Sequence, residues 1–223
     1  MNIELDFVAV LSQWPLLLQG VIWTLALSAV SAILGTVLGI VCAWTRTQGS
    51  AWAQSVVSSY VELIRNTPFI VQLFFIFFGL PAAGIKLSPE WASVIAMVIN
   101  LGAYSAEIVR AGIQSTPRGQ IEAAMSLALT SMQTFTRVVL PPALQRVWPA
   151  LVSQTIIVML GSAVCGQIST EELSYGANLI QSRNFRAFEA FIVATALYLL
   201  LSVFVRATLN WLGVRFLFGA HRG

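Results

Sequence analysis

The chain has 223 residues, of which 57% are hydrophobic and only 9% are charged, and its mean hydropathy is +0.81. Soluble globular domains usually carry about 25% charged residues, so this chain has too few charges to cover a soluble surface. The composition excludes a soluble globular protein and indicates an integral membrane protein, because a surface that faces lipid needs no charges, and the placement of the charges matters more than the net charge of +3.

The first expected element is a membrane-spanning helix from about Leu16 to Trp44, longer than the roughly 20 apolar residues that a bilayer requires. The segment before it carries Glu4 and Asp6 but no lysine or arginine, so no cleaved secretory signal peptide is expected. Within the span, Gly35-Thr-Val-Leu-Gly39 is a G-x-x-x-G motif. Such a motif allows close helix packing, either inside the subunit or against a second subunit.

Four more apolar runs follow. The second span covers Thr67 to about Leu80 and is extended backwards by the amphipathic stretch Val56–Ile64. The third, fourth and fifth spans are expected at Trp91–Ile108, Trp148–Gln167 and Phe188–Val205. Backbone groups in lipid must be bonded within the protein, and these runs lack the alternation of barrel strands, so they are expected to be helices. The sequence therefore predicts a single all-α transmembrane domain, 1–223, with five transmembrane helices.

The distribution of basic residues predicts the orientation of these spans. If the N-terminus is periplasmic, the inner segments hold nine basic residues and the outer segments hold three, which is the asymmetry expected of membrane proteins. The inner residues are Arg46, Arg65, Arg110, Arg118, Arg137, Arg146, Arg206, Arg215 and Arg222. The outer ones are Lys86, Arg183 and Arg186. We therefore expect a periplasmic N-terminus and a cytoplasmic C-terminus.

One inner segment is long and patterned like a helix. Thr116 is suited to cap a helix that begins at Pro117 and continues to about Leu129. The pair Pro141-Pro142 is expected to stop any helix that reaches it. Apolar residues share one face of the expected helix at positions Ile121, Ala124, Met125 and Ala128. This face either lies on the membrane surface or fits a groove on a soluble partner.

Polar residues inside the spans are candidates for the lining of a translocation path. They are Gln72, Asn100, Tyr104, Ser153 and Ser162. The pairs Glu62–Arg65 and Glu107–Arg110 have the spacing of neighbours on one helix face. We interpret them as structural or coupling contacts and not as acid–base pairs.

Several kinds of chemistry lack the residues that they require. The only lysine is Lys86, so the chain has no phosphate-binding loop ending in lysine and cannot hold ATP in that way. The only histidine is His221, which excludes a histidine-based zinc site or catalytic triad. Cys42 and Cys165 are interpreted as small buried apolar residues. We therefore expect no enzyme activity, no metal and no cofactor on this chain.

An ordered set of motifs resembles a known family. Gly119-Gln-Ile-Glu122-Ala123-Ala124, followed by Leu140-Pro141, resembles the EAA loop of bacterial ABC importer permeases. The stretches 60–75 and 104–115, Glu172-Leu173 and 185–189 are similar to its polar amino-acid branch, the histidine, glutamine and arginine uptake type. The resemblance extends from about Leu18 to Phe218, which is nearly the whole chain.

This resemblance implies a type I importer permease of the bacterial inner membrane, crossing it several times. Its coupling loop would be about 114–142, and a short coupling helix would dock on an ATPase subunit that binds the ATP. The coupling residues implied are Gly119, Gln120, Glu122, Ala123, Ala124, Met125 and Ala128. The other implied partners are a second permease, a periplasmic binding protein, an amino-acid substrate and lipid, without nucleic acid. The alternative is a secondary, ion-driven transporter of small polar solutes.

Two departures from the family pattern matter. The family usually has glycine where this chain has Ala128, which leaves the turn after the coupling helix undetermined. Many relatives carry Lys-Asp-Thr-Ser where this chain has Leu160-Gly161-Ser162-Ala163. One explanation is that an unlike second permease makes more of the substrate contact, which favours a heterodimer. The other is a path lined by neutral groups such as Gln154 and Gln167.

Overall fold

The computed structural model describes residues 5–218 and consists of helices over that range. The long helices are α2 (Trp14–Gln48), α3 (Ala51–Arg65), α6 (Pro89–Gln114), α9 (Leu140–Gly161) and α11 (Ala187–Leu212). The shorter ones are α1 (Phe7–Leu11), α4 (Phe69–Phe74), α5 (Leu80–Ala82), α7 (Arg118–Ser126), α8 (Ser131–Thr134) and α10 (Leu173–Asn184). They are joined or continued by the π-helical segments η1 (Phe75–Gly79), η2 (Phe135–Val139) and η4 (Gly213–Phe218) and the 3-10 helix η3 (Ser162–Ile168). Glu4, His221 and Arg222 lie outside the described residues.

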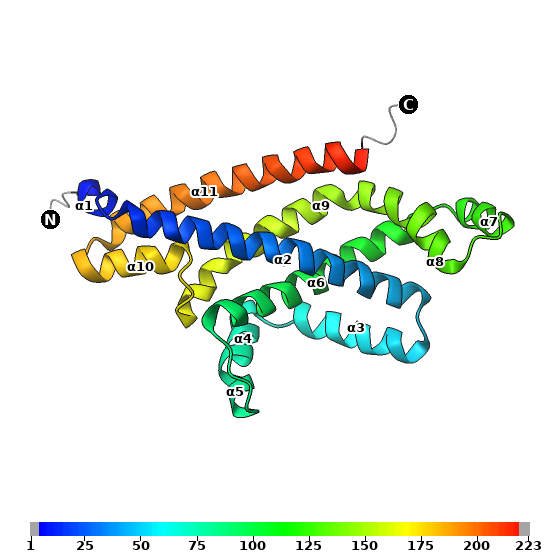
Figure 1. Cartoon of the computed structure of the whole chain (residues 1–223), viewed down its shortest axis with the longest axis horizontal. Helices are drawn as coiled ribbons and strands as arrows, with labels where there is room; N and C mark the ends of the chain where they lie inside the picture. Colours follow the sequence, from blue (N-terminus) through cyan, green and yellow to red (C-terminus); the bar gives the residue numbers. More distant parts are fainter. Residues whose placement is uncertain (1–4, 219–223) are drawn as a thin grey trace.

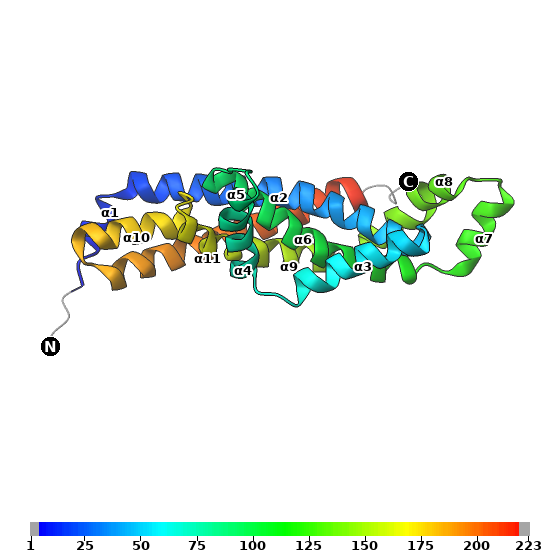
Figure 2. The ribbon, with the colours of Figure 1, turned by 90° about the horizontal axis from the view of Figure 1, so that it is seen from below.

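The helices α2, α6, α9 and α11 run along the long axis of the molecule (Figure 1). At one end lie α1 and α10, and at the other lie α7 and α8 (Figure 2). Among the helix pairs, α2 and α6 have the most extensive contact. Four stretches are long and apolar enough to cross a membrane, namely α2, α6, Ser131–Ile168 and Ala187–Leu217. These stretches confirm an all-helical membrane protein and match four of the five predicted spans.

The second predicted span is broken instead of continuous. The stretch Ala51–Arg65 and the stretch Phe69–Ala82 meet at an angle of 111°. Pro68 has no backbone N–H and disfavours a helical conformation of the residue before it, while the Thr67 hydroxyl donates to the carbonyl oxygen of Leu63 at 2.8 Å. As a result, α3 packs beside α2 and α6, and the segment from α4 to α5 projects from the bundle (Figure 1). The amphipathic stretch is therefore a separate helix and does not extend the second span.

The prediction that Pro141-Pro142 stops the helix is wrong. The helical stretch from Ser131 to Ile168 passes through both prolines without interruption. They are the second and third residues of α9, in a first turn where proline is tolerated, and the wider π-helical turn of η2 ends directly before α9. The helix that contains the fourth span consequently begins well before Trp148, although its end agrees with the predicted one.

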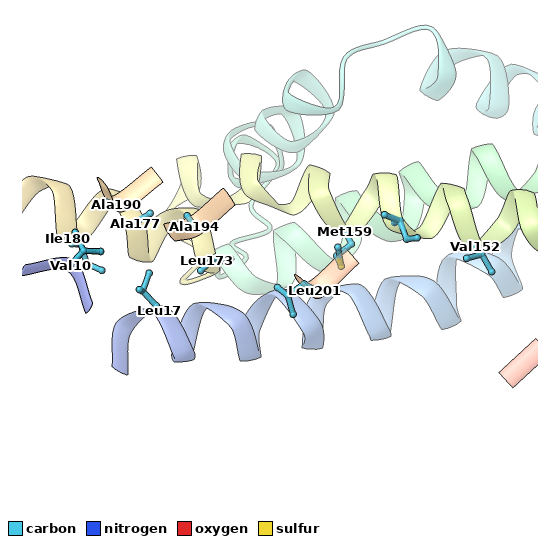
Figure 3. Packing of buried hydrophobic residues seen from close by; sticks show 11 residues of the cluster. Val10, Leu17, Val152, Met159, Leu173, Ala177, Ile180, Ala190, Ala194 and Leu201 are labelled. Carbon is cyan, nitrogen blue, oxygen red and sulfur yellow. The ribbon is translucent and has the colours of Figure 1, made fainter. Parts of the chain in front are cut away.

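A buried core joins the elements at the end of the molecule where α1 and α10 lie (Figure 3). Val10, Leu17, Leu173 and Ile180 belong to it, and each is at most 4% exposed. Ala177 of α10 and Ala190 and Ala194 of α11 also belong to the cluster, and Val152, Ile156 and Met159 continue it onto α9. This packing fixes α10 as a part of the bundle and not as a free loop.

Glu172 is a fully buried acidic residue at the start of α10. Its carboxylate accepts hydrogen bonds from the backbone N–H groups of Ser174, at 3.0 Å, and Tyr175, at 2.8 Å. The hydroxyl of Tyr198 on α11 donates to the same carboxylate. An acidic side chain at a helix N-terminus satisfies backbone donors and interacts favourably with the helix dipole. Glu172 therefore caps α10 and ties it to α11.

The G-x-x-x-G motif of α2 packs inside the subunit. A Cβ atom added at Gly35 would lie 2.9 Å from the Cβ of Leu101, and one added at Gly39 would lie 2.5 Å from the Cβ of Ser105. Both neighbours belong to α6, so the motif lets the two helices come together. Of the two uses left open by the sequence, the structure shows the internal one.

We expect Gly39→Leu to destabilise the protein strongly. The added Cβ would also lie 2.9 Å from the backbone nitrogen of Ala106, which cannot move without shifting α6. Overpacking of this kind typically costs about 1–3 kcal/mol, and backbone conflicts cost more. The measurement is the midpoint of thermal unfolding of the purified protein in detergent. Gly161→Leu is the matched control, because a Cβ at Gly161 meets nothing within 4 Å; equal midpoints for the two variants would contradict the packing argument.

Charged residues connect α2 to α6 near the end of the bundle that carries α7. The carboxylate of Glu107 accepts from Arg46 of α2 at 2.6 Å and from Arg110 of α6. The expected contact between Glu107 and Arg110 is thus present and is shared with a third residue. The other expected pair is not seen in the described part of the chain, because Arg65 lies over the ring of Tyr104 instead of binding Glu62.

Candidate functional site

A groove of about 460 Å³ lies between the turn that joins α3 to α4 and the helices α6 and α9. Asn100 and Tyr104, one turn apart on α6, contribute to one wall. Gln154, Val158 and Gly161 of α9 contribute to another, and their spacing of four and three residues keeps them on one helix face. Thr67, Pro68 and Phe69 close the groove at the bend between α3 and α4.

A hydrogen-bond network behind the groove fixes the position of its lining residue Asn100. The Gln72 amide nitrogen donates to the carbonyl oxygens of Ile64, at 2.7 Å, and Thr67, at 3.0 Å. This leaves the Gln72 Oε1 to accept from the Asn100 Nδ2 at 3.0 Å. Gln72 and Asn100 are each 8% exposed, so the pair is almost enclosed. The bend between α3 and α4 therefore sets the position of Asn100 on α6.

Tyr104 lies at the side of the groove with its ring under a cation. The Arg65 Cζ is 5.5 Å from the centroid of the Tyr104 ring, which is within the range of a cation–π interaction. Arg65 ends α3, directly before the bend, and its residue is exposed. A positive charge thus stands beside a groove whose other polar groups are neutral.

The remaining path candidates from the sequence lie elsewhere. Ser153 is exposed and is not among the residues that line the groove. Ser162 is fully buried, and its hydroxyl donates to the carbonyl oxygen of Met159 at 2.7 Å. In their place α9 presents Gln154 and Gly161. Helical spacing gives the signal for this choice, because Gln154 is seven residues from Gly161 and shares its face, whereas Ser153 lies about a quarter turn away.

The second candidate element is α7, which joins α6 to α8 and stands at the far end of the molecule (Figure 2). Pro117 is the residue before its first turn, and the side-chain hydroxyl of Thr116, expected as the cap, is buried without a hydrogen-bond partner. The predicted cap is therefore wrong by one residue, because the backbone of Pro117 already has the extended conformation of a cap. The helix also ends at Ser126, three residues before the predicted end.

The burial of the expected coupling residues divides α7 into two faces. Ala124 is only 3% exposed, and Ile121 lines a small pocket between α7, α8 and the end of α2. The predicted apolar face is therefore turned largely toward the protein itself, although Met125 is 66% exposed. The outward surface is formed by Gly119, Gln120, Glu122 and Ala123, with Leu127 and Ala128 after the helix end.

The turn after α7 shows why the family usually has glycine at the position of Ala128. Its φ angle is 55°, a left-handed conformation that glycine adopts without strain. The N–H of Leu129 bonds the carbonyl oxygen of Ala124 at 3.2 Å, and the N–H of Ala128 bonds that of Met125 at 2.9 Å. These two bonds are those of a Schellman motif, in which the left-handed position usually holds glycine. This chain keeps the turn with alanine in that position.

Comparisons with known proteins identify the family. The sequence profile of the binding-protein-dependent transport system inner membrane component matches residues 35–217. The glutamine transport system permease protein GlnP of Escherichia coli (strain K12) is 35% identical over 202 residues, covering 90% of this chain and 92% of the relative. The probable glutamine ABC transporter permease protein GlnM of Bacillus subtilis (strain 168) is 33% identical over 215 residues, covering 96% and 98%.

A solved structure agrees with the sequence relatives. It is the crystal structure of an amino acid ABC transporter with histidines, with a TM-score of 0.85, 34% identity, and coverage of 96% of this chain and 100% of that one. Of the two transporter classes that the sequence left open, the family selects the ATP-driven importer, in which the membrane subunit is a permease of the bacterial inner membrane. The chain belongs to the family of binding-protein-dependent transport system inner membrane components, and its resemblance to the permeases of polar amino-acid ABC importers is confirmed.

Proposed function

We propose that this chain forms part of the translocation path of an amino-acid importer and receives the work of ATP hydrolysis through α7. The observation that carries this proposal is the connectivity of the site. The helix α7 lies in the connection between α6 and α9, and these are the helices that supply two walls of the groove. A displacement applied to α7 would be passed to both walls.

The outward surface of α7 is suited to a protein partner. Its small residues, Gly119 and Ala123, permit close approach, and the exposed carboxylate of Glu122 is available to a cation or a helix N-terminus. Met125 and Leu127 add exposed apolar area next to them, 66% and 76% exposed. We assign ATP binding to a partner ATPase that docks on this surface, so that this chain needs no cofactor of its own.

The groove is our candidate for the path of the substrate. Asn100 and Tyr104 of α6 and Gln154 of α9 offer hydrogen-bonding groups within largely apolar membrane spans. Polar groups inside membrane spans usually mark a pathway. Gln72 holds Asn100 in position and so contributes indirectly. Ser162 remains a proposal of lower priority because it does not line the groove, and Ser153, which is exposed and also outside the groove, is not assigned to the path.

The orientation and the other partners follow from the same assignment. The end with α7 is cytoplasmic, and the end with α1 and α10 is periplasmic and receives the substrate-binding protein. A second permease completes the path. We favour an unlike second permease, because the groove of this chain lacks the ionised pair that many relatives carry at 160–163. Purification of the importer with only this permease beside its ATPase would reject the heterodimer.

We expect uptake by the importer to depend on ATP and not on the membrane potential. The complete importer would be reconstituted in vesicles with its binding protein, and uptake of radiolabelled amino acids would be measured. Removal of ATP should lower uptake to background, because this chain holds no phosphate-binding loop and takes its energy from the partner. A protonophore should leave the initial rate nearly unchanged. Uptake that follows the ion gradient in the absence of ATP would reject the proposed function.

A further inference from the structure

The charge of the groove is one-sided. None of the residues that line it is aspartate or glutamate. The polar position of α9 is the amide Gln154, which is neutral at any pH of interest. A free amino acid carries a carboxylate that balances its own ammonium, whereas a cationic side chain adds a second positive charge, which loses hydration in a protein-lined space and needs an anion of the protein nearby. The groove supplies none.

Asn100 lines the groove, and its amide is held in one orientation by Gln72. Two backbone carbonyl oxygens hold the Gln72 amide nitrogen, so Gln72 turns its oxygen toward Asn100. Asn100 must then use its own nitrogen for that bond. Its Oδ1 has no partner among residues 5–218 and remains free to accept. An acceptor in this position suits an ammonium or amide N–H group of an amino acid.

The neighbouring charge is positive. Arg65 stands over the ring of Tyr104, which is a lining residue. Within the described part of the chain, the arginines in ion pairs are Arg46, Arg110 and Arg186, and Arg65 is not among them. A guanidinium without a carboxylate partner, set beside a groove of neutral polar groups, is a natural receptor for a carboxylate.

We infer that the groove takes amino acids with an uncharged or acidic side chain and rejects those with a cationic side chain. Arg65 receives the carboxylate, Asn100 accepts from the ammonium or an amide N–H group, and Gln154 sets the charge preference by being neutral. This inference rests on the proposed function, since it assigns the charge class of the cargo to the same groove. Gln154 and Arg65 are then specificity-determining residues of this chain.

The test is equilibrium binding to the complete importer in nanodiscs, without ATP and without the binding protein, so that only the permeases select. Radiolabelled glutamine is the probe and arginine is the competitor. For the wild type we expect arginine to bind at least about tenfold more weakly than glutamine. Gln154→Glu should shift the ratio of the two dissociation constants toward arginine by about tenfold or more. Ser153→Glu adds the same carboxylate one residue away, outside the groove, and should leave the ratio unchanged.

Arg65 provides a second and independent readout. Arg65→Gln should weaken glutamine binding about tenfold, whereas Arg65→Lys, which keeps the charge, should retain most of the affinity. A wild type that binds arginine as tightly as glutamine would overturn the inference, and so would equal effects of Gln154→Glu and Ser153→Glu. The proposed function fails separately, if the complete importer with its binding protein shows no ATP-dependent uptake of any amino acid.

Discussion

Glu122→Lys is expected to abolish uptake and to prevent stable association with the ATPase subunit, while insertion into the membrane stays normal. Glu122 is exposed on α7, and within the described residues its side chain forms no ion pair. The substitution therefore removes no stabilising contact inside the permease. At the interface it replaces a negative charge by a positive one, and like charges in contact cost several kcal/mol. That corresponds to an association at least about 100-fold weaker.

The measurement combines co-purification of the ATPase with ATP-dependent uptake in reconstituted vesicles. Glu122→Gln keeps the size and the hydrogen-bonding capacity of the side chain, so we expect it to lose only part of the activity. Glu62→Lys reverses a charge on an exposed face of α3 and is the matched control, for which near-normal association is expected. Normal transport by Glu122→Lys would move the coupling contact to another part of the loop.

The composition predicted an integral membrane protein. The apolar runs predicted where its spans lie, because a helix that crosses lipid must be long and hydrophobic enough. The bend at Pro68 could be anticipated in principle, since proline both lacks a donor and restricts Thr67. Pro141 and Pro142 carry the same signal and do not end a helix. The two sites differ in the backbone before the proline, because the π-helical turn η2 precedes α9 and its proline pair. No local sequence pattern predicts a π-helical turn.

The site was predicted less completely than the fold. Asn100 and Tyr104 line the groove, and Gln72 lies behind it, hydrogen-bonded to Asn100. Ser153 was chosen for its polarity alone, and the neighbouring Gln154 is the residue that faces the groove. Which face of α9 turns inward depends on how it packs against α6, which is a tertiary property. Helical periodicity shows which residues of α9 share a face, but only the packing against α6 shows which of these faces turns toward the groove.

The same reason explains the faces of α7. The spacing of the apolar positions Ile121 and Ala124 predicted a face that lies on the membrane surface or fits a groove on a soluble partner. In the structure Ala124 is buried and Ile121 lines a small pocket, and α7 packs against its own α8 and η2. A helix that is held rigidly by its own chain can transmit force, and an outward face is then left for a partner. The face of α7 that packs on its own chain and the face that would contact a partner are different, and periodicity alone does not show which face is which.

We expect Gly161→Trp to block uptake almost completely while leaving the importer folded and assembled. The φ angle of Gly161 is −64° and its ψ angle is −20°, a helical conformation that any residue adopts. A Cβ there meets nothing within 4 Å, and glycine inside a helix is less favourable than alanine by about 1 kcal/mol. The substitution therefore adds no strain. Its indole would instead occupy the groove that Gly161 lines.

Graded substitution separates occlusion from misfolding. Gly161→Ala should transport at nearly the normal rate, Gly161→Leu should be slowed, and Gly161→Trp should fall to background, because only the size of the side chain changes along the series. Ser153→Trp places the same indole on the exposed side of α9 and should leave transport intact. The ATPase should co-purify with every variant, since α7 is untouched. A Gly161→Trp variant that still transports would mean that the substrate passes outside this groove, and the assignments of Asn100, Tyr104 and Gln154 would fall with it.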